Sequence, residues 1–235
     1  MNPHPYYRTV KSPAEPGNSS PLYVRWDFHS RLEENSRDSD PSFRLEKCAR
    51  TVNSLARGRS CDLLEIGCWP TTLATLLQKN IAYFGMDIAI PEPAPNLLEL
   101  DYSQDEIKFG SRNFDIVVAA GVFEYLGGRE QKKLREIRDL LNDNGTFVLA
   151  YTNFEHLNDS LLDRTVYNNI QTIRDFKEDL ELFFHVESCF PSSHNWHRTE
   201  PNRRFLKRLQ MPLEMNLPLI SRLLAVSYFF VCSPK

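Results

Sequence analysis

The sequence predicts an α/β protein built on one seven-stranded, mostly parallel sheet with helices on both faces. Three observations lead to this fold class. Short apolar runs alternate with segments whose apolar residues recur at helical spacing, which is typical of a parallel sheet covered by its crossover helices. Residues 114–120 are apolar except at one position, as in a strand buried on both faces. The chain has 235 residues, 41% of them hydrophobic and 25% charged, which is enough for one domain with a full core.

The predicted strands follow one another at regular intervals. They lie at 62–66, 82–87, 96–101, 114–120, 146–151, 185–190 and 226–232. Three prolines, Pro91, Pro93 and Pro95, interrupt the connection between the second and third strands, so no helix is expected there.

Four helices are predicted around these strands. The first begins at Asp40-Pro41, a capping residue followed by a proline, and stops at Gly58. Its apolar face consists of Leu45, Cys48, Val52 and Leu55. The others are expected from Leu73 to Asn80, from about Leu134 to a stop at Asn144-Gly145, and from Thr172 to Phe184, where Thr172 and Asp175 have capping-box spacing.

The domain organisation expected is a tail at 1–39 followed by a single domain at 40–235. The tail is polar and Pro-rich, yet it carries Tyr23 and Trp26, and such aromatic residues suggest a lid over a site. Residues 196–222 form an insertion with several arginines and lysines. That insertion fits a solvated helix face, a wall that meets an anionic substrate group, or an interface.

Charge and composition exclude several classes of protein. The net charge of −3 and the pI of about 6.1 give no electrostatic case for a nucleic-acid partner. No apolar run approaches the ~20 residues of a membrane helix, and the start lacks a secretory signal pattern. The five cysteines include no CxxC pair, and no ligand cluster indicates a metal. We therefore expect a reduced, cytoplasmic protein without a membrane partner or metal; its oligomeric state is not predicted.

Ligands of such sheets bind at the carboxyl ends of the strands, so the residues that follow each strand are the candidate site. The first strand leads into Glu65-Ile66-Gly67-Cys68-Trp69-Pro70-Thr71-Thr72, a turn expected to present backbone N–H groups to an anionic group. The second strand ends at Asp87, the third at Asp101-Tyr102 and the fourth at Gly121.

This ordered set resembles the class I S-adenosylmethionine-dependent methyltransferases, in particular the small-molecule branch. The resemblance rests on Glu65-x-Gly67, Asp87, Asp101, the strand 114–118 and the turn 122–126, and it covers roughly residues 60–155. It implies a Rossmann-like fold, S-adenosylmethionine as cofactor and methyl transfer as reaction. The chain departs from the family's glycine-rich turn at Trp69-Pro70, which restricts the usual glycine path.

The resemblance also implies roles for individual residues. Glu65 and Gly67, with Cys68 and Trp69, border the methionine part of the cofactor. Asp87, with Ile88, binds the ribose; Asp101 and Tyr102 meet the adenine; Ala120 and Gly121 flank the sulfonium.

On the acceptor side, His156 is predicted as the general base because it follows the fifth strand, with Glu124 and Tyr125 as further catalytic candidates. Tyr23, Trp26, His194, Trp196 and His197 are predicted to bind the acceptor. We expect a small-molecule acceptor that is methylated on oxygen rather than nitrogen. The expected setting is the biosynthesis of a specialised metabolite. The alternatives are a non-catalytic binding or scaffold protein on the same fold, favoured by Trp69-Pro70, and a nicotinamide enzyme, whose glycine spacing is missing.

Overall fold

The computed structural model describes residues 43–156, 170–194 and 225–235. The predicted tail at 1–39, with Tyr23 and Trp26, and the insertion at 196–222, with Trp196 and His197, lie outside the described residues. None of the helices in the described ranges is long and apolar enough to cross a membrane.

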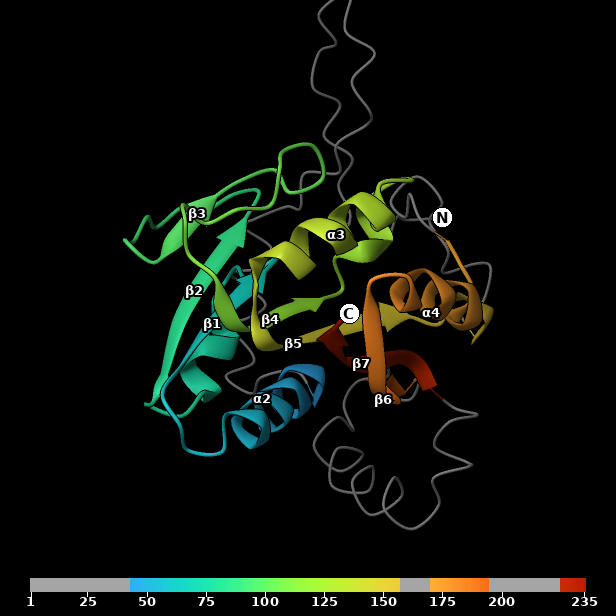
Figure 1. The fold of residues 1–235 in the computed structure, drawn as a ribbon, viewed down its shortest axis with the longest axis horizontal. Coiled ribbons are helices and arrows are strands. Elements are labelled where there is room, and N and C mark those ends of the chain that lie inside the picture. The colour runs from blue at the N-terminus through green and yellow to red at the C-terminus, as the bar shows by residue number, and fades with distance from the viewer. Residues whose placement is uncertain (1–42, 157–169, 195–224) are drawn as a thin grey trace, which may run out of the picture.

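The seven predicted strands are all present and form one sheet with the order β3-β2-β1-β4-β5-β7-β6 (Figure 1). Strands β1 to β5 are parallel, whereas β7 lies between β5 and β6 and is antiparallel to both. The bounds are β1 Cys61–Ile66, β2 Ile81–Asp87, β3 Leu97–Glu99, β4 Phe114–Ala120, β5 Leu141–Thr152, β6 Phe184–His194 and β7 Ala225–Pro234. The predicted mostly parallel α/β sheet is thereby confirmed.

Helices cover both faces of this sheet (Figure 1). Helix α2, Phe43–Ala56, lies on one face, and α3, Glu130–Leu140, and α4, Ile173–Glu181, lie on the other. Three short 3₁₀ helices follow strands at the carboxyl edge or just beyond it: η1 Thr72–Leu76, η2 Phe123–Tyr125 and η3 Phe154–His156.

The core consists of two layers because neighbouring strand residues point to opposite faces. On the α2 side, Cys48 and Val52 of the helix are fully buried against Leu63 and Val118 of the sheet. On the other side, Phe147 and Phe184 of the sheet pack in one cluster with side chains of α3 and α4. The apolar face predicted for the first helix is therefore the face that it buries.

Two predicted helices differ from the structure. The segment expected to be helical from Leu73 to Asn80 forms only the 3₁₀ helix η1. Helix α3 ends at Leu140 rather than at Asn144-Gly145, because β5 already begins at Leu141 and pairs there with Phe114. The cap of α4 is confirmed: the Thr172 hydroxyl accepts the Asp175 backbone N–H at 3.0 Å.

Candidate functional site

The predicted site residues come together at one edge of the sheet. Parallel pairing places Ile66 of β1 beside Met86 of β2 and Ala119 of β4, and Asp87 of β2 beside Glu99 of β3. The turns that follow these four strands therefore leave the sheet at the same edge, which is the edge where ligands of such sheets bind.

The backbone donors of the turn after β1 are taken up within the protein, chiefly by acceptors on β2. The N–H groups of Gly67 and Cys68 donate to the Met86 carbonyl at 2.8 and 3.1 Å. The Trp69 N–H donates to Asp87 Oδ2 at 2.9 Å, Pro70 has no N–H, and the Thr71 N–H donates to the Cys68 carbonyl. The prediction that this turn presents N–H groups to an anionic ligand is therefore wrong for residues 67–71, because the tight turn and Asp87 take them up.

Two glycines at this edge have backbones that side chains disfavour. Gly67 has φ +75°, and a Cβ there would lie 3.0 Å from Val122 Cγ2. Gly121 has φ +79°, and a Cβ there would lie 2.9 Å from a terminal nitrogen of Arg44. Both positions favour glycine for their backbone conformation, and Gly67 is also short of space, whereas the atom nearest to Gly121 is the end of the flexible Arg44 side chain.

Arg44 is a site residue that the sequence analysis missed. It lies in the first turn of α2, and its guanidinium stands over Gly121. It also stabilises the ionised forms of two buried acids, Glu65 and Glu124, and so lowers the pKa of each. Within the described ranges Arg44 makes no hydrogen bond or ion pair. The sequence offered one signal for this residue, which is that a basic side chain lies beside the apolar face of the helix that precedes β1.

Glu65 is buried on the α2 side of β1. Its side chain is 4% exposed, and its Oε2 accepts the Tyr83 hydroxyl at 2.5 Å. Burial raises the pKa of the Glu65 carboxyl from 4.5 to about 8; the Tyr83 hydrogen bond and Arg44 oppose that rise, and the Asp87 carboxylate adds to it. A cation placed beside Glu65 would favour its ionised form.

Glu124 is the second buried acid and lies in η2, the 3₁₀ helix that follows β4. Its Oε1 accepts both the backbone N–H and the hydroxyl of Thr152, at 2.9 and 2.7 Å. Its Oε2 is buried and has no hydrogen-bond partner among the residues that the structure describes. Burial raises the pKa of Glu124, against the opposing effects of these hydrogen bonds and of Arg44. One oxygen is thus fixed in position, and the other is left for a further partner.

The two acids predicted to bind ribose and adenine also organise their own turns. Asp87 is 8% exposed and accepts from the N–H of Trp69 through Oδ2 and from the N–H of Ile88, at 2.7 Å, through Oδ1. Asp101 Oδ1 accepts from the backbone N–H and hydroxyl of Ser103, at 3.0 and 2.6 Å. Each carboxylate retains lone pairs for a ligand hydroxyl or amine.

Trp69 and Tyr102 are two buried aromatic residues at this edge of the sheet. Trp69 is 8% exposed, packs with Cys68 and Ile90 against β2 and β3, and is joined to Pro70 by a cis peptide bond. The Tyr102 hydroxyl lies 3.8 Å from the place that a Cβ on Gly67 would occupy. Ala120, predicted beside the sulfonium, is the partly exposed last residue of β4.

The acceptor side is described only in part. Tyr125 is half-buried in η2, two residues beyond the β4 turn. His156 ends η3 and His194 ends β6, but the side chains of both lie outside the described residues. Their predicted roles stay predictions.

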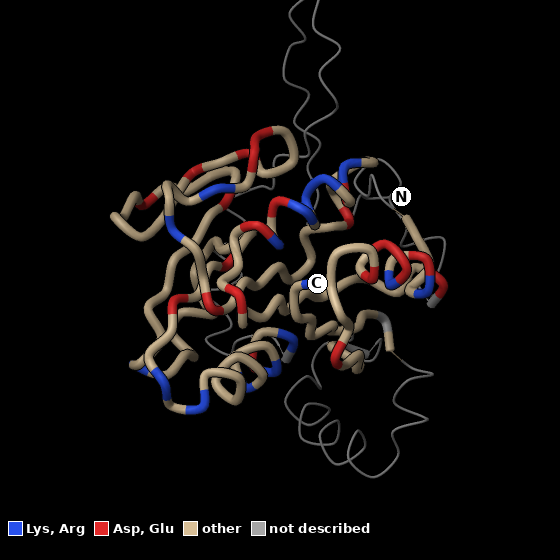
Figure 2. Tube along the Cα trace, in the orientation of Figure 1, with Lys and Arg blue, Asp and Glu red and all other residues tan. Residues whose placement is uncertain are grey.

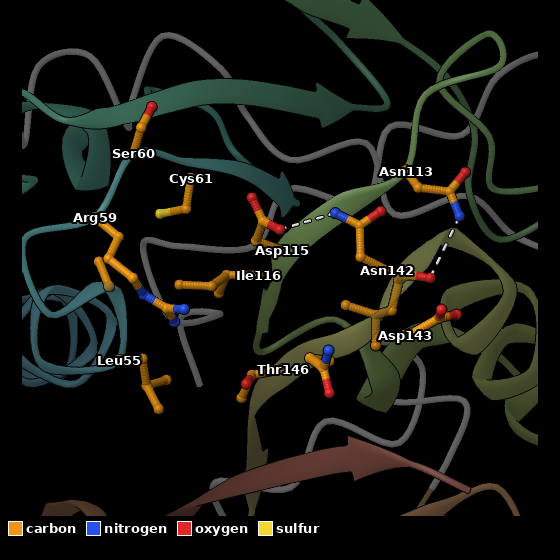
Figure 3. A pocket seen from close by; sticks show the side chains of 13 residues that line it. Leu55, Arg59, Ser60, Cys61, Asn113, Asp115, Ile116, Asn142, Asp143 and Thr146 are labelled. Carbon is orange, nitrogen blue, oxygen red and sulfur yellow. Dashed lines mark hydrogen bonds between the residues drawn. The ribbon is translucent and has the colours of Figure 1, made fainter.

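A polar pocket lies at the opposite edge of the sheet (Figure 3). It has a volume of about 500 Å³ and is lined by the amino ends of β1, β4 and β5. Its wall is tied together by Asp115, which accepts from the Asn142 side chain at 2.8 Å and from the Asp62 backbone N–H at 2.9 Å. These hydrogen bonds connect the amino ends of the strands, at the edge of the sheet opposite to the candidate site.

Comparison with known proteins identifies the class to which this fold and site belong. The family model of the methyltransferase domain matches residues 41–209, so the chain belongs to that family. It is a class I methyltransferase, and its cofactor is S-adenosylmethionine. No curated protein matches the sequence.

Solved structures share the fold at low identity. A SAM-dependent methyltransferase from Archaeoglobus fulgidus is 19% identical, with a TM-score of 0.60 over 89% of this chain and 100% of that one. A TehB-like SAM-dependent methyltransferase from Corynebacterium glutamicum is 16% identical, with a TM-score of 0.56 over 88% and 96%. The N-methyltransferase NodS from Bradyrhizobium japonicum, in complex with S-adenosyl-L-homocysteine, is 14% identical, with a TM-score of 0.54 over 88% and 97%.

The residues at this edge fit S-adenosylmethionine chemically. The cofactor carries a carboxylate, an ammonium group, ribose hydroxyls and an adenine. Arg44 offers a guanidinium with no hydrogen bond in the described structure, Glu65 a buried carboxyl, and Asp87 and Asp101 carboxylate lone pairs. The bare Cα of Gly121 keeps the end of β4 open beside Arg44.

Proposed function

We propose that this methyltransferase acts on a small organic acceptor, at oxygen rather than nitrogen, in the biosynthesis of a specialised metabolite. The observation that carries cofactor binding in this proposal is the position of the Arg44 guanidinium over Gly121, close enough to Glu65 and Glu124 to shift their pKa values. These charged groups gather at the carboxyl ends of β1 and β4, where the methionine part of the cofactor would lie.

In this proposal each end of the cofactor has its own protein partners. Arg44 binds the carboxylate, because residues 67–71 have no backbone donor left for it. Glu65 faces the ammonium group, and the remaining lone pairs of Asp87 accept from the ribose hydroxyls. Asp101 and Tyr102 border the adenine, Cys68, Trp69 and Ile88 form the neighbouring wall, and Ala120 and Gly121 flank the sulfonium.

A bound S-adenosylmethionine supplies an already activated methyl group, so the protein has to align the acceptor and take up its proton. We assign the proton to Glu124 Oε2, since that oxygen has no hydrogen-bond partner in the described part of the chain, whereas Thr152 donates twice to Oε1. The acceptor oxygen would form its bond to the methyl carbon as the methyl–sulfur bond breaks and its electron pair goes to sulfur, which leaves S-adenosylhomocysteine, and the acceptor hydroxyl would give its proton to Oε2. Its raised pKa makes Glu124 a stronger base than an exposed glutamate. His156 is the second candidate for this role.

One observation favours the alternative of a non-catalytic protein on the same fold. The Trp69–Pro70 turn is closed by its own hydrogen bonds, which leaves cofactor binding dependent on side chains. The two proposals differ in what they expect of cofactor binding and of turnover.

Calorimetry with S-adenosylmethionine, S-adenosylhomocysteine and NAD tests this directly. The proposal expects binding of the first two and none of NAD; absence of binding to either sulfur ligand would contradict it.

Release of S-adenosylhomocysteine is then followed over a panel of phenols, carboxylic acids and amines. Glu124→Gln, compared with His156→Ala, should lower turnover about 10²-fold or more if Glu124 takes the proton, with cofactor affinity nearly kept. Cofactor binding without turnover of any acceptor class would favour the non-catalytic alternative.

A further inference from the structure

Three polar side chains hold the segment that follows β3. Two of them belong to one face of α3, and the third belongs to the residue just before this helix. They are Arg129, Lys133 and Glu136, which are spaced i, i+4 and i+7 and so point the same way. Their contacts follow the order of the segment: Arg129 donates to the Ser103 carbonyl and the Gln104 side chain, Lys133 donates to the Asp105 carbonyl, and Glu136 accepts the Ile107 N–H at 2.9 Å. Figure 2 shows the basic and acidic residues that run along α3.

The middle member of this row is a fully buried lysine. The Lys133 side chain is 0% exposed, and its Nζ lies 2.8 Å from Glu136 Oε2. A buried ion pair of this kind contributes little more to stability than well-packed apolar side chains would. The ion pair instead fixes the register between α3 and the segment, because Lys133 and Glu136 each bind a particular backbone group. Apolar contact alone would allow the segment to shift along the helix.

The segment so fixed carries the residues proposed to meet adenine. The Asp101 carbonyl accepts the N–H groups of Gln104 and Asp105, and its Oδ1 accepts from Ser103, so residues 101–105 form one hydrogen-bonded turn. Tyr102 lies within this turn and is buried, with its hydroxyl near Gly67. A shift of the turn along α3 would move Asp101 and Tyr102 together.

We propose that Arg129, Lys133 and Glu136 are positioning residues for the adenosine half of the cofactor, which they affect by fixing the 101–107 segment in register with α3. This inference rests on the proposed placement of the adenine beside Asp101 and Tyr102. Their hydrogen bonds described above go to residues 103–107 and not to the residues proposed to bind the methionine half. Replacing them should therefore weaken the binding of ligands that contain adenosine, and of each such ligand by the same factor.

The test is calorimetry of two ligands on the full chain: S-adenosylhomocysteine, and 5′-methylthioadenosine, which lacks the amino-acid half. The double variant Lys133→Met/Glu136→Gln, which leaves no buried unpaired charge, should weaken both ligands by the same factor, about tenfold. Arg129→Ala, a surface change, should weaken both at least about threefold and serves if the double variant does not fold. Arg44→Met should weaken only S-adenosylhomocysteine.

Two matched controls separate positioning from stability. Arg138→Met alters another basic residue of α3, whose side chain donates to Asp139 and not to the 101–107 segment, and should leave both affinities unchanged. Leu180→Ala removes a buried side chain of α4 and should lower the melting temperature without changing either affinity. Unchanged affinities in the double variant or in Arg129→Ala, or weakening of S-adenosylhomocysteine alone, would overturn the positioning role while the proposed function stands. Absence of binding to the unmodified protein would overturn both.

Discussion

Replacing Asp87 by alanine should lower both the stability of the protein and its affinity for the cofactor. The carboxylate accepts the buried Trp69 N–H at 2.9 Å and the partly buried Ile88 N–H at 2.7 Å. A buried donor left without a partner costs about 1–3 kcal/mol, and the half-buried one costs less. The free energy of unfolding should therefore fall by about 2–4 kcal/mol, a large part of the 5–15 kcal/mol typical of a domain.

Urea unfolding measures the first effect and calorimetry with S-adenosylhomocysteine the second. With a denaturant slope of about 2 kcal/mol/M, the midpoint should fall by about 1–2 M. Asp87→Asn keeps one acceptor oxygen, so its unfolding free energy should lie between those of the native protein and Asp87→Ala. The loss of hydrogen bonds to the ribose should weaken ligand binding by about 1.5–3 kcal/mol in the alanine variant.

Asp115→Ala is a matched control at the opposite edge of the sheet. Asp115 also accepts a backbone N–H, that of Asp62, at 2.9 Å, so its loss should lower stability. It lies at the amino end of β4, so ligand affinity should stay unchanged. Our reasoning would be refuted if Asp87→Ala unfolded at the native midpoint, or if Asp87→Ala and Asp115→Ala bound S-adenosylhomocysteine equally well.

Three further changes test neighbouring parts of the structure. Arg44→Met should weaken S-adenosylmethionine binding at least tenfold with little change in melting temperature, and Arg44→Lys should recover part of that loss; equal affinities in titrations of all three proteins would contradict the role of the guanidinium. Glu65 ionises near pH 4.5 when unfolded but about 8 when folded, so only the folded state keeps that proton between these values. Raising the pH through this range should lower the free energy of unfolding by up to about 1.4 kcal/mol per pH unit. Urea titrations at pH 5 to 8 should show this slope in the native protein and not in Glu65→Gln. Equal slopes in the two proteins would exclude a raised pKa of Glu65. Thr172→Ala should cost about 0.5–2 kcal/mol of unfolding free energy through loss of the α4 cap, whereas Thr172→Ser should be close to native.

The sheet was predictable because burial leaves its mark on local sequence. Residues 114–120 are apolar on both faces, and 81–87 and 146–151 contain the same kind of run, so neighbouring strands on either side could be recognised. The end of α3 was not predictable in the same way. Leu140 and Leu141 are both apolar, and only the pairing of Leu141 with Phe114 decides that the strand begins there.

The candidate site was predictable to the extent that it depends on strand ends. Glu65, Gly67, Asp87 and Asp101 follow from the order of the strands along the chain. Arg44 could not be found that way, because its position over Gly121 depends on how α2 is rotated against the sheet. Nor could the hydrogen bonds that take up the N–H groups of residues 67–69 be found in that way, since their acceptors, Met86 and Asp87, belong to another strand.

These two omissions are connected. A glycine-rich turn can offer its backbone N–H groups to an anionic ligand, and such donors are part of the fold itself. Here Asp87 and the Met86 carbonyl take up the donors of the Trp69–Pro70 turn, so recognition of a carboxylate has to come from a side chain. Arg44 can serve only while α2 stays packed through Cys48 and Val52, both fully buried. Cofactor affinity in this protein should therefore depend on the docking of α2, and Val52→Ala, which loosens that packing without touching the site, should weaken S-adenosylhomocysteine binding in calorimetry as well as lower the melting temperature. Native affinity in a destabilised Val52→Ala protein would show that Arg44 is held in place by other contacts or is not the group that binds the carboxylate.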